Sequence, residues 1–514
     1  MSSQPEQQVT LTAISLVTVL TVVSKGLGLF REMLLGWTFG ISEPVAALGV
    51  ANGFSSTIFE VLTLTVVVVA LPLYTELKLR QGSSAAQAFL ANLLSLLLLG
   101  AVPLVALLWF LATPLLRLFA GGLAPAELLL TQSFLRTVLP AAFFQIIGAI
   151  CTIYLQSERK MVQIVLASMA VNIAYISAIF LAMRYGSIWL AKGVVLGAAL
   201  TSLLFWLQAR AHGFAWRPKL DFKDPMLRRI IYLMIPSWLG MSIRTLNIMV
   251  DRSVASYLGV GAIAAIEYAQ KTLHAASSLV VPTIYLIITP LFAESAVKGL
   301  AKLREAFHKS LRYILIIMVP MTLGGIFVAH NTISVIYGYG AFDQTAIALT
   351  VQAMLFYTPN TLFLVVINEV IYRYFLALQN TLTPMLINVA ALLLNIILNI
   401  ILSRYMGVAG LALASTLATL LAVLLGMWRM GRYRDLEPGA SPRAALPWVF
   451  LAALTMLIPV AALNLWLVPG AVLRWQRLAV ILLQVALGGG AYLATISLSP
   501  LEEVVELKQM LRRR

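Results

Sequence analysis

Fourteen apolar runs, each long enough to cross a lipid bilayer, recur along this chain with short polar breaks between them. A membrane helix needs about 20 consecutive apolar residues. Within lipid every backbone polar group must find a partner in the protein, so spanning segments are helices or closed barrels. The chain is also 61% hydrophobic and only 11% charged, unlike ordinary soluble domains. We therefore predict an all-α polytopic membrane protein with spans near 10–35, 45–73, 84–112, 126–153, 162–184, 190–211, 230–258, 263–292, 311–334, 347–375, 383–403, 408–430, 444–466 and 474–498.

The formal charge of +16 would suit nucleic acid, but the positions of the cations are more informative than their sum. If residue 1 is cytoplasmic, 24 of the 36 Lys and Arg residues fall in cytoplasmic segments, six in the opposite loops and six in the spans. An excess of Lys and Arg marks the cytoplasmic loops of membrane proteins. The sequence therefore predicts that both termini lie in the cytoplasm.

No arrangement of residues typical of an enzyme is visible in the sequence. The single Cys151 excludes a Cys-based metal cluster, and the four His residues are scattered. A phosphate-binding G-x-x-x-x-G-K-[ST] loop for ATP is missing as well. We therefore predict a protein that is not an enzyme and holds no cofactor or metal. Any work it does must draw on an ion gradient, the membrane potential or the gradient of its own substrate.

The chain also repeats itself weakly. At an offset of 219 residues, SKGLGLFREMLLGWTFG falls on SIRTLNIMVDRSVASYLG, so that Lys25 matches Arg244 and Glu32 matches Asp251. At an offset of 223, the LQ of YLQSERK falls on the LQ of FLALQNTLTP, and an Asn follows in each copy. We predict two pseudo-symmetric six-helix lobes and two C-terminal helices, divided at 1–220, 221–435 and 436–514. Transporters with such parallel repeats bind substrate between them.

Ionisable side chains within the spans form the candidate site. Such a group costs about 2.5 to 3.5 kcal/mol near the bilayer centre on insertion scales, so it normally faces a water-filled cavity or a charged partner. Lys25, Gly28 and Glu32 share one face of the first span, and Asn247 and Asp251 repeat part of that spacing on the seventh. We predict a cleft between the lobes with substrate-binding cations Lys25, Arg31, Arg244, Arg252 and Lys271, and polar or coupling residues Glu32, Asn247, Asp251, Gln270 and Glu60.

A cationic cleft favours an anion with several oxygens, such as a phosphate or pyrophosphate, because Arg and Lys bind these by charge-assisted hydrogen bonds. The predicted acids Glu32, Asp251 and Glu60 could bind Na⁺ or H⁺, so transport coupled to either ion is possible. For Arg31 and Arg252, near the predicted outer helix ends, the alternative is local ion pairing with the neighbouring acids. Glu267 and Lys271 form a favourable i, i+4 pair.

Several short motifs follow one another along nearly the whole chain. They are SKGLGLFRE (24–32), VDRSVASYLGVGAIAAIEYAQK (250–271), PLFAES (290–295), YGYGAF (337–342), YRYFLALQNTLTP (372–384) and GVAGLALASTLA (407–418). In this order and at these spacings the chain resembles the MurJ/MviN lipid II flippase family of the MOP exporter superfamily.

The resemblance implies a flippase of the bacterial cytoplasmic (inner) membrane. Its substrate would be lipid II, an undecaprenyl-pyrophosphate-linked peptidoglycan precursor, moved from the cytoplasmic to the outer leaflet by alternating access. The pyrophosphate would bind the cationic residues, and the prenyl tail would stay in lipid near the last two helices, 444–498. The expected partners are this lipid-linked anion, membrane lipids and envelope-synthesis enzymes, with no nucleic acid, and the expected state is a monomer.

Three departures from the family's pattern qualify the resemblance. Lys25 and Lys271 stand where the family usually has Arg, which keeps the charge but loses the bidentate fork. The second span offers Ser55 and Ser56 where the family carries a basic pair. Asn380 replaces a common Asp. A Wzx-like flippase of another polyprenyl-linked oligosaccharide is the main alternative, followed by a MATE-type cation antiporter and a scaffold that transports nothing.

Overall fold

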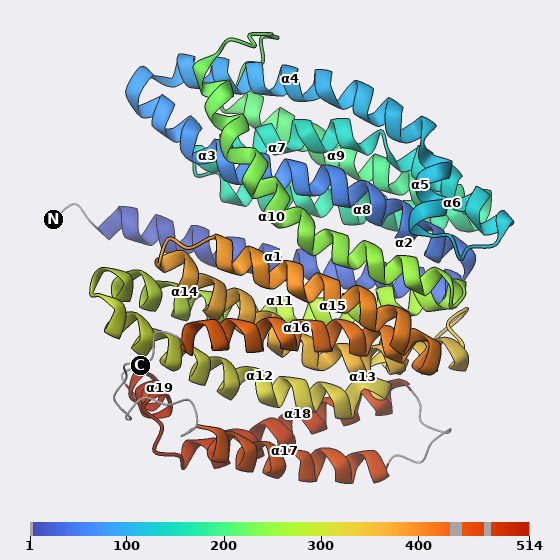
Figure 1. The fold of residues 1–514 in the computed structure, drawn as a ribbon, viewed down its shortest axis with the longest axis vertical. Coiled ribbons are helices and arrows are strands. Elements are labelled where there is room, and N and C mark those ends of the chain that lie inside the picture. The colour runs from blue at the N-terminus through green and yellow to red at the C-terminus, as the bar shows by residue number, and fades with distance from the viewer. Residues whose placement is uncertain (1–3, 432–444, 467–473, 513–514) are drawn as a thin grey trace. The chain divides into compact units, whose positions relative to one another are not determined.

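The chain is built of helices (Figure 1). The computed structural model describes residues 4–431, 445–466 and 474–512, and these contain no strand. Twelve helical segments are long and apolar enough to cross a membrane. The first and seventh predicted spans, which carry the charged stretches, fall on two further long helices, α1 (Gln4–Phe39) and α10 (Pro225–Ser256). Each of the fourteen predicted spans therefore lies on one helical segment, and the predicted fold class is confirmed.

Two compact units divide the chain, the first ending at Ala264 and the second beginning at Ala265. The first unit contains α1, α10 and the helices between them. These are α2 (Glu43–Ser55), the π-helix η1 (Ser56–Glu60), α3 (Val61–Gln81), α4 (Ser83–Phe110), α5 (Ala112–Phe119), α6 (Pro125–Val138), α7 (Ala141–Ser157), α8 (Met161–Tyr185) and α9 (Ile188–Ala211).

The second unit takes over within the first turns of α11 (Val260–Val297). It continues with α12 (Leu300–Ile336), α13 (Gln344–Val365), the π-helix η2 (Val366–Ile371), α14 (Tyr372–Ala377), α15 (Leu382–Met406), α16 (Val408–Gly431), α17 (Leu446–Trp466), α18 (Arg474–Ser497) and α19 (Glu502–Arg512).

The division into units differs from the repeat. By sequence, α10 opens the second repeat, yet it packs along α3 and belongs to the first unit. The predicted boundaries at residues 220 and 435 are drawn from the sequence repeat. They stay a prediction.

The sequence repeat is also visible in the turns between helices. Gly40 and Gly259, which stand 219 residues apart, both have positive φ (55° and 99°). Gly82 and Gly299 (88° and 100°) precede α4 and α12, and Gly186 and Gly407 (99° and 57°) follow α8 and α15. A positive φ favours glycine because it has no Cβ. Equivalent turns of the two halves thus share a glycine with positive φ.

One further pair of turns corrects an alignment drawn from the sequence. Arg159 and Gln379 are the non-glycine residues with positive φ (57° and 56°) among the described residues. After each, a backbone N–H closes the turn onto a carbonyl five residues back, Lys160 onto Leu155 (2.8 Å) and Asn380 onto the carbonyl of residue 375 (2.9 Å). The offset here is 220, not 223. The helices that follow, α8 and α15, begin and end 221 residues apart. At these offsets Asn172 does not fall on Asn395, so the suggested match of the two Asn residues is wrong.

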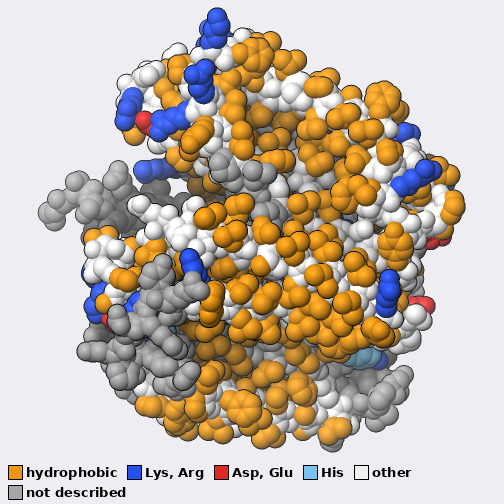
Figure 2. Space-filling model, in the orientation of Figure 1, with side chains coloured by type: hydrophobic (Ala, Val, Ile, Leu, Met, Phe, Trp, Pro, Cys, Tyr) orange, Lys and Arg blue, Asp and Glu red, His pale blue; other side chains and the backbone are white. Residues whose placement is uncertain are grey.

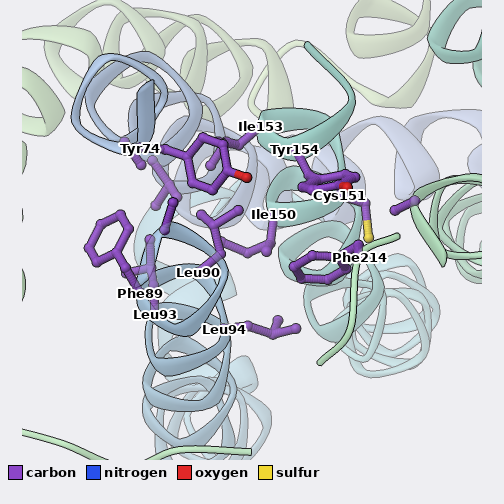
Figure 3. Packing of buried hydrophobic residues seen from close by; sticks show 14 of the residues in the cluster. Tyr74, Phe89, Leu90, Leu93, Leu94, Ile150, Cys151, Ile153, Tyr154 and Phe214 are labelled. Atoms are coloured by element: carbon purple, nitrogen blue, oxygen red, sulfur yellow. The ribbon is translucent and has the colours of Figure 1, made fainter. Parts of the chain in front are cut away.

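An aromatic and aliphatic core fills the first unit between α3, α4, α7 and α9 (Figure 3). Tyr74 from α3 and Tyr154 from α7 meet edge to face at 6.4 Å between ring centroids, and Phe214 packs on Tyr154 at 5.1 Å. Cys151 is buried in the same cluster. These contacts hold the segment that follows α9 against α7.

Ion pairs hold the short helix α19 against α12 in the second unit. On α19, Glu503 accepts from Arg312 Nε at 2.6 Å, and Glu506 accepts from Lys309 Nζ at 2.6 Å and from the Tyr313 hydroxyl at 2.9 Å. Both the Arg312 and the Glu503 side chains are buried. In the view of Figure 2, hydrophobic side chains cover most of the surface of both units, as helices that face lipid require.

Candidate functional site

A polar cluster between α1 and α8 is the most completely described part of the predicted site. Arg31 donates to Glu32 Oε1 through Nε (3.1 Å) and a terminal nitrogen (2.5 Å). Its other terminal nitrogen donates to Asn172 Oδ1 at 3.1 Å, and its guanidinium lies 5.1 Å from the centre of the Tyr175 ring. Asn172 in turn donates to the Ser24 carbonyl at 3.3 Å.

The cluster shows how α1 tolerates its charges. Glu32 is 7% exposed, so its charge would be costly without the adjacent guanidinium. Local ion pairing, the alternative drawn from the sequence, is therefore correct for Arg31 and Glu32. The pair is also tied to α8, a contact that the sequence pattern did not predict. Lys25, two turns before Glu32 on α1, is half-buried.

A second cluster forms where α10 meets α2. The guanidinium of Arg252 lies so close to Gly53 that a Cβ built there would be 1.3 Å from a terminal nitrogen of Arg252. Helical side chains point toward the N-terminus of their helix, so Arg252 reaches back from the end of α10. Its neighbour Asp251 is 3% exposed, and Asn247 is half-buried. Arg244 lies on α10, but its side chain is outside the described residues.

Two more glycines, Gly121 and Gly122, contact the end of α10. The Gly122 N–H donates to Ser256 Oγ at 3.1 Å, and a Cβ at Gly122 would lie 2.5 Å from the backbone of Ser256 and Tyr257. A Cβ at Gly121 would lie 2.8 Å from the Tyr257 hydroxyl oxygen. Together with Gly53, these positions let the backbone of α10 and the guanidinium of Arg252 approach the first six spans closely.

The π-helix η1 begins at Ser56, three residues after Gly53. The Ser56 and Thr57 hydroxyls donate to the Gly53 carbonyl at 3.1 and 2.7 Å. Single π-turns within α-helices occur frequently at functional sites. Glu60, predicted as a coupling acid, ends η1 with an exposed side chain.

The remaining predicted residues lie on α11 in the second unit. Lys271 Nζ is 3.8 Å from Glu267 Oε2, which confirms the predicted i, i+4 pair, and Gln270 is half-buried beside them. The predicted cations thus divide between the units, with Lys25, Arg31 and Arg252 in the first and Lys271 in the second. Their convergence on one cleft stays a prediction.

A further half-buried cation of the second unit, Arg373, did not enter the predicted site. Arg373 on α14 donates to Glu369 Oε2 through Nε (3.0 Å) and a terminal nitrogen (2.7 Å), and its guanidinium lies 4.4 Å from the centre of the Tyr285 ring on α11. The i, i+4 spacing of Glu369 and Arg373 was the available signal. Like Arg31, this arginine combines an acid with an aromatic ring.

No group of three or more His, Cys, Asp or Glu residues that could hold a metal ion occurs in the part of the chain that the structure describes. The clusters combine Arg with single carboxylates, amides and tyrosines. Arginine binds oxyanions by charge-assisted hydrogen bonds, and the oxyanions here are the carboxylates of Glu32 and Glu369.

Comparison with known proteins identifies the family. The family model described as "Lipid II flippase MurJ" matches residues 35–485. The chain belongs to this family. A "Probable lipid II flippase MurJ" of Buchnera aphidicola subsp. Baizongia pistaciae is 23% identical over 452 residues, covering 86% of this chain and 87% of the relative. The "Lipid II flippase MurJ" of Burkholderia cenocepacia is 23% identical over 445 residues, covering 83% and 85%.

Solved structures of the MOP superfamily share the fold. A "Lipid II flippase MurJ, inward closed conformation" superposes with a TM-score of 0.79 at 24% identity, covering 94% of this chain and 98% of that one. A multidrug resistance MATE family transporter in an inward-facing conformation gives 0.63 at 14% identity, covering 80% and 98%. The MurJ family, expected from the sequence motifs, is confirmed, and the likeness to the MATE transporter shows a shared fold.

Proposed function

We propose that this protein is a lipid II flippase, which moves the undecaprenyl-pyrophosphate-linked peptidoglycan precursor from the cytoplasmic to the outer leaflet by alternating access. The observation that carries the proposal is the family match over residues 35–485, which includes the charged stretches of α10 and α11. The family is one of transporters, so the protein's role is translocation rather than catalysis.

The half-buried cations support a pyrophosphate-bearing substrate. Arg252 is presented on the backbone of Gly53, and Lys25 lies half-buried on the helix that carries the Arg31 cluster. In a site shielded from water, such groups bind a diphosphate by charge-assisted hydrogen bonds. We assign the pyrophosphate to Lys25, Arg244, Arg252 and Lys271. Arg31 has a positioning role through Glu32 and Asn172.

The proposed setting is the bacterial cytoplasmic membrane with both termini in the cytoplasm, as the distribution of Lys and Arg indicates. We propose a monomer that works alongside envelope-synthesis enzymes. Glu32, Glu60 and Asp251 are the acids on which Na⁺ or H⁺ coupling would act in the first unit.

Complementation tests the function. Cells depleted of their own lipid II flippase should grow when they express this chain and lyse when they express an empty vector. Failure to grow, with normal amounts of the protein in the membrane, would overturn the assignment. Growth of cells that lack an O-antigen flippase, with no growth of the lipid II-depleted cells, would assign the chain to a Wzx-like substrate instead.

A further inference from the structure

The segment between α9 and α10 crosses the outside of α4 without forming a helix (Figure 1). Asn92 on α4 holds it by both sides of its amide, donating to the Asp221 carbonyl at 2.9 Å and accepting from the Asp221 N–H at 2.9 Å. Asn92 is only 1% exposed. We call residues 216–223 the strap.

Ser95, one turn further along α4, holds the other end of the strap. Its hydroxyl accepts from Trp216 Nε1 at 3.3 Å and from the Lys219 N–H at 3.4 Å. The Trp216 ring also meets Trp206 of α9 edge to face at 5.8 Å. The backbone of the strap is therefore fixed by two buried polar side chains.

Such fixation is what a nonhelical segment near lipid requires, because unpaired backbone groups are costly there. The 28 residues of α4 make a helix of about 42 Å, against a hydrocarbon core of about 30 Å. The polar residues of α4 lie at its start, and its apolar part extends to Phe110. Counted back from Phe110, a core of about 30 Å takes about 20 residues and begins near Ala91, so Asn92 and Ser95 lie close to its edge. The strap therefore runs close to the boundary between lipid and water.

The outward side of the strap alternates cations with apolar groups. Leu220 and Phe222 are 57% and 70% exposed. Arg217, Lys219 and Lys223 are exposed between and beside them. A single acid, Asp221, lies among them and pairs with Lys219 at 3.1 Å, so the strap keeps a net positive charge.

We propose that the strap is a binding site for the headgroups of anionic phospholipids. Leu220 and Phe222 enter the boundary between headgroups and acyl chains, and Arg217, Lys219 and Lys223 contact the phosphates. Exposed apolar side chains combined with Lys and Arg bind anionic membrane surfaces in this way. The inference goes beyond the proposed function and takes from it only the leaflet, which is the cytoplasmic one.

Lipid titration of the purified full-length protein tests the charge. Phosphatidylglycerol should raise the melting temperature of the wild type more than phosphatidylcholine or inorganic phosphate does. The double variant Lys219→Gln/Lys223→Gln should need roughly tenfold more phosphatidylglycerol for the same shift. The matched control is Lys298→Gln/Lys302→Gln, two exposed lysines at the turn between α11 and α12. An equal loss in both pairs, or no loss in the strap pair, would overturn the proposal.

Depth is tested separately in nanodiscs of phosphatidylcholine with and without phosphatidylglycerol. A nitroxide on Pro218→Cys, in a Cys151→Ala background, should become more accessible to oxygen and less accessible to a water-soluble nickel complex when phosphatidylglycerol is present. Asn92→Ala, which frees the backbone of Asp221, should abolish that change. A nitroxide that stays equally accessible to the nickel complex in both lipids would show that the strap lies in water, and would refute the site.

Discussion

At the scale of single residues, both hydrogen bonding and close packing position the charged side chains. Arg31 donates to the Glu32 carboxylate and the Asn172 amide and lies against the Tyr175 ring. The guanidinium of Arg252 packs against Gly53. The first arrangement stabilises a charge within the helices. The second places a cation in space that any residue larger than glycine at position 53 would occupy.

The Arg31–Glu32 pair should behave as a unit. Glu32→Ala or Arg31→Ala alone should each cost about 2 kcal/mol of stability, because a buried charge loses its partner and Arg31 is itself partly exposed. The double variant should cost less than the two singles together. Thermal unfolding in detergent measures this, and the exposed pair Lys302 and Glu305 is the control, with an expected coupling below about 0.5 kcal/mol. Additive losses at Arg31 and Glu32 would contradict the pairing.

Gly53→Ala should impair transport more than it impairs folding. The new methyl group must displace the flexible end of Arg252, which costs little stability but moves the cation. Gly26→Ala, whose Cβ would meet nothing within 4 Å, is the matched control and should transport normally. Flipping of lipid II in proteoliposomes is the measurement. If Arg252→Gln transports normally while Gly53→Ala does not, the loss in Gly53→Ala is not caused by displacement of the Arg252 guanidinium.

At the scale of helices, close approach depends on small residues. On α9, a Cβ at Gly193 would lie 2.4 Å from the Ala178 Cβ of α8, and one at Gly197 would lie 2.9 Å from Val171. The G-x-x-x-G spacing is a common helix-packing surface in membranes. At α19, two ion pairs instead hold the helix against α12.

Gly193→Val should push α9 away from α8 and destabilise the protein by about 1–3 kcal/mol, as overpacking does in cores. Gly100→Val, where a Cβ would meet nothing within 4 Å, should change the melting temperature far less. Equal shifts for the two variants would show that the α8–α9 contact carries no special weight.

The docking of α19 should weaken in acid. The hydrogen bond from Lys309 lowers the pKa of Glu506, with a further contribution from the Tyr313 hydroxyl. A lowered pKa adds stability above the ordinary glutamate value of about 4.3, and that stability is lost as pH falls through the folded-state pKa. The wild type should therefore melt above Glu506→Gln at pH 7, and the two should converge below about pH 4. A constant difference across this range would exclude the titration of Glu506.

At the scale of the whole molecule, the halves repeat one another in the turns more faithfully than in the side chains. Positive φ values recur at equivalent turns, but α10 packs with the first unit and α16 is followed by two further spans. Duplication has kept the backbone plan and changed the packing.

Transport should depend on cations from both halves. Lys25→Ala, Arg244→Ala and Lys271→Ala should each weaken lipid II flipping while the protein stays folded, and the triple variant should abolish it. Arg31→Ala should impair flipping mainly in proportion to its loss of stability. Normal growth of flippase-depleted cells on the triple variant would refute a cationic site and leave a scaffold role.

The sequence predicted the helices well because each span is a long apolar run, and it predicted pairs within one helix, such as Glu267 and Lys271. It could not predict partners from distant segments. The contact of Arg31 with Asn172 joins residues 141 positions apart, and that of Asn92 with Asp221 joins residues 129 apart. Both depend on which helix faces pack together. A helical pattern alone does not reveal that.

The π-helix between α2 and α3 has a consequence for any change in chain length. A π-turn holds one more residue than an α-helical turn needs, so removing one residue from Ser56–Glu60 would leave an unbroken α-helix. Because the π-turn takes up that extra residue within a single turn, the helices before and after the deletion would keep nearly the same rotation about their common axis. Gly53 would still face Arg252, whereas deleting one residue from the regular helix on either side would turn it away by about 100°.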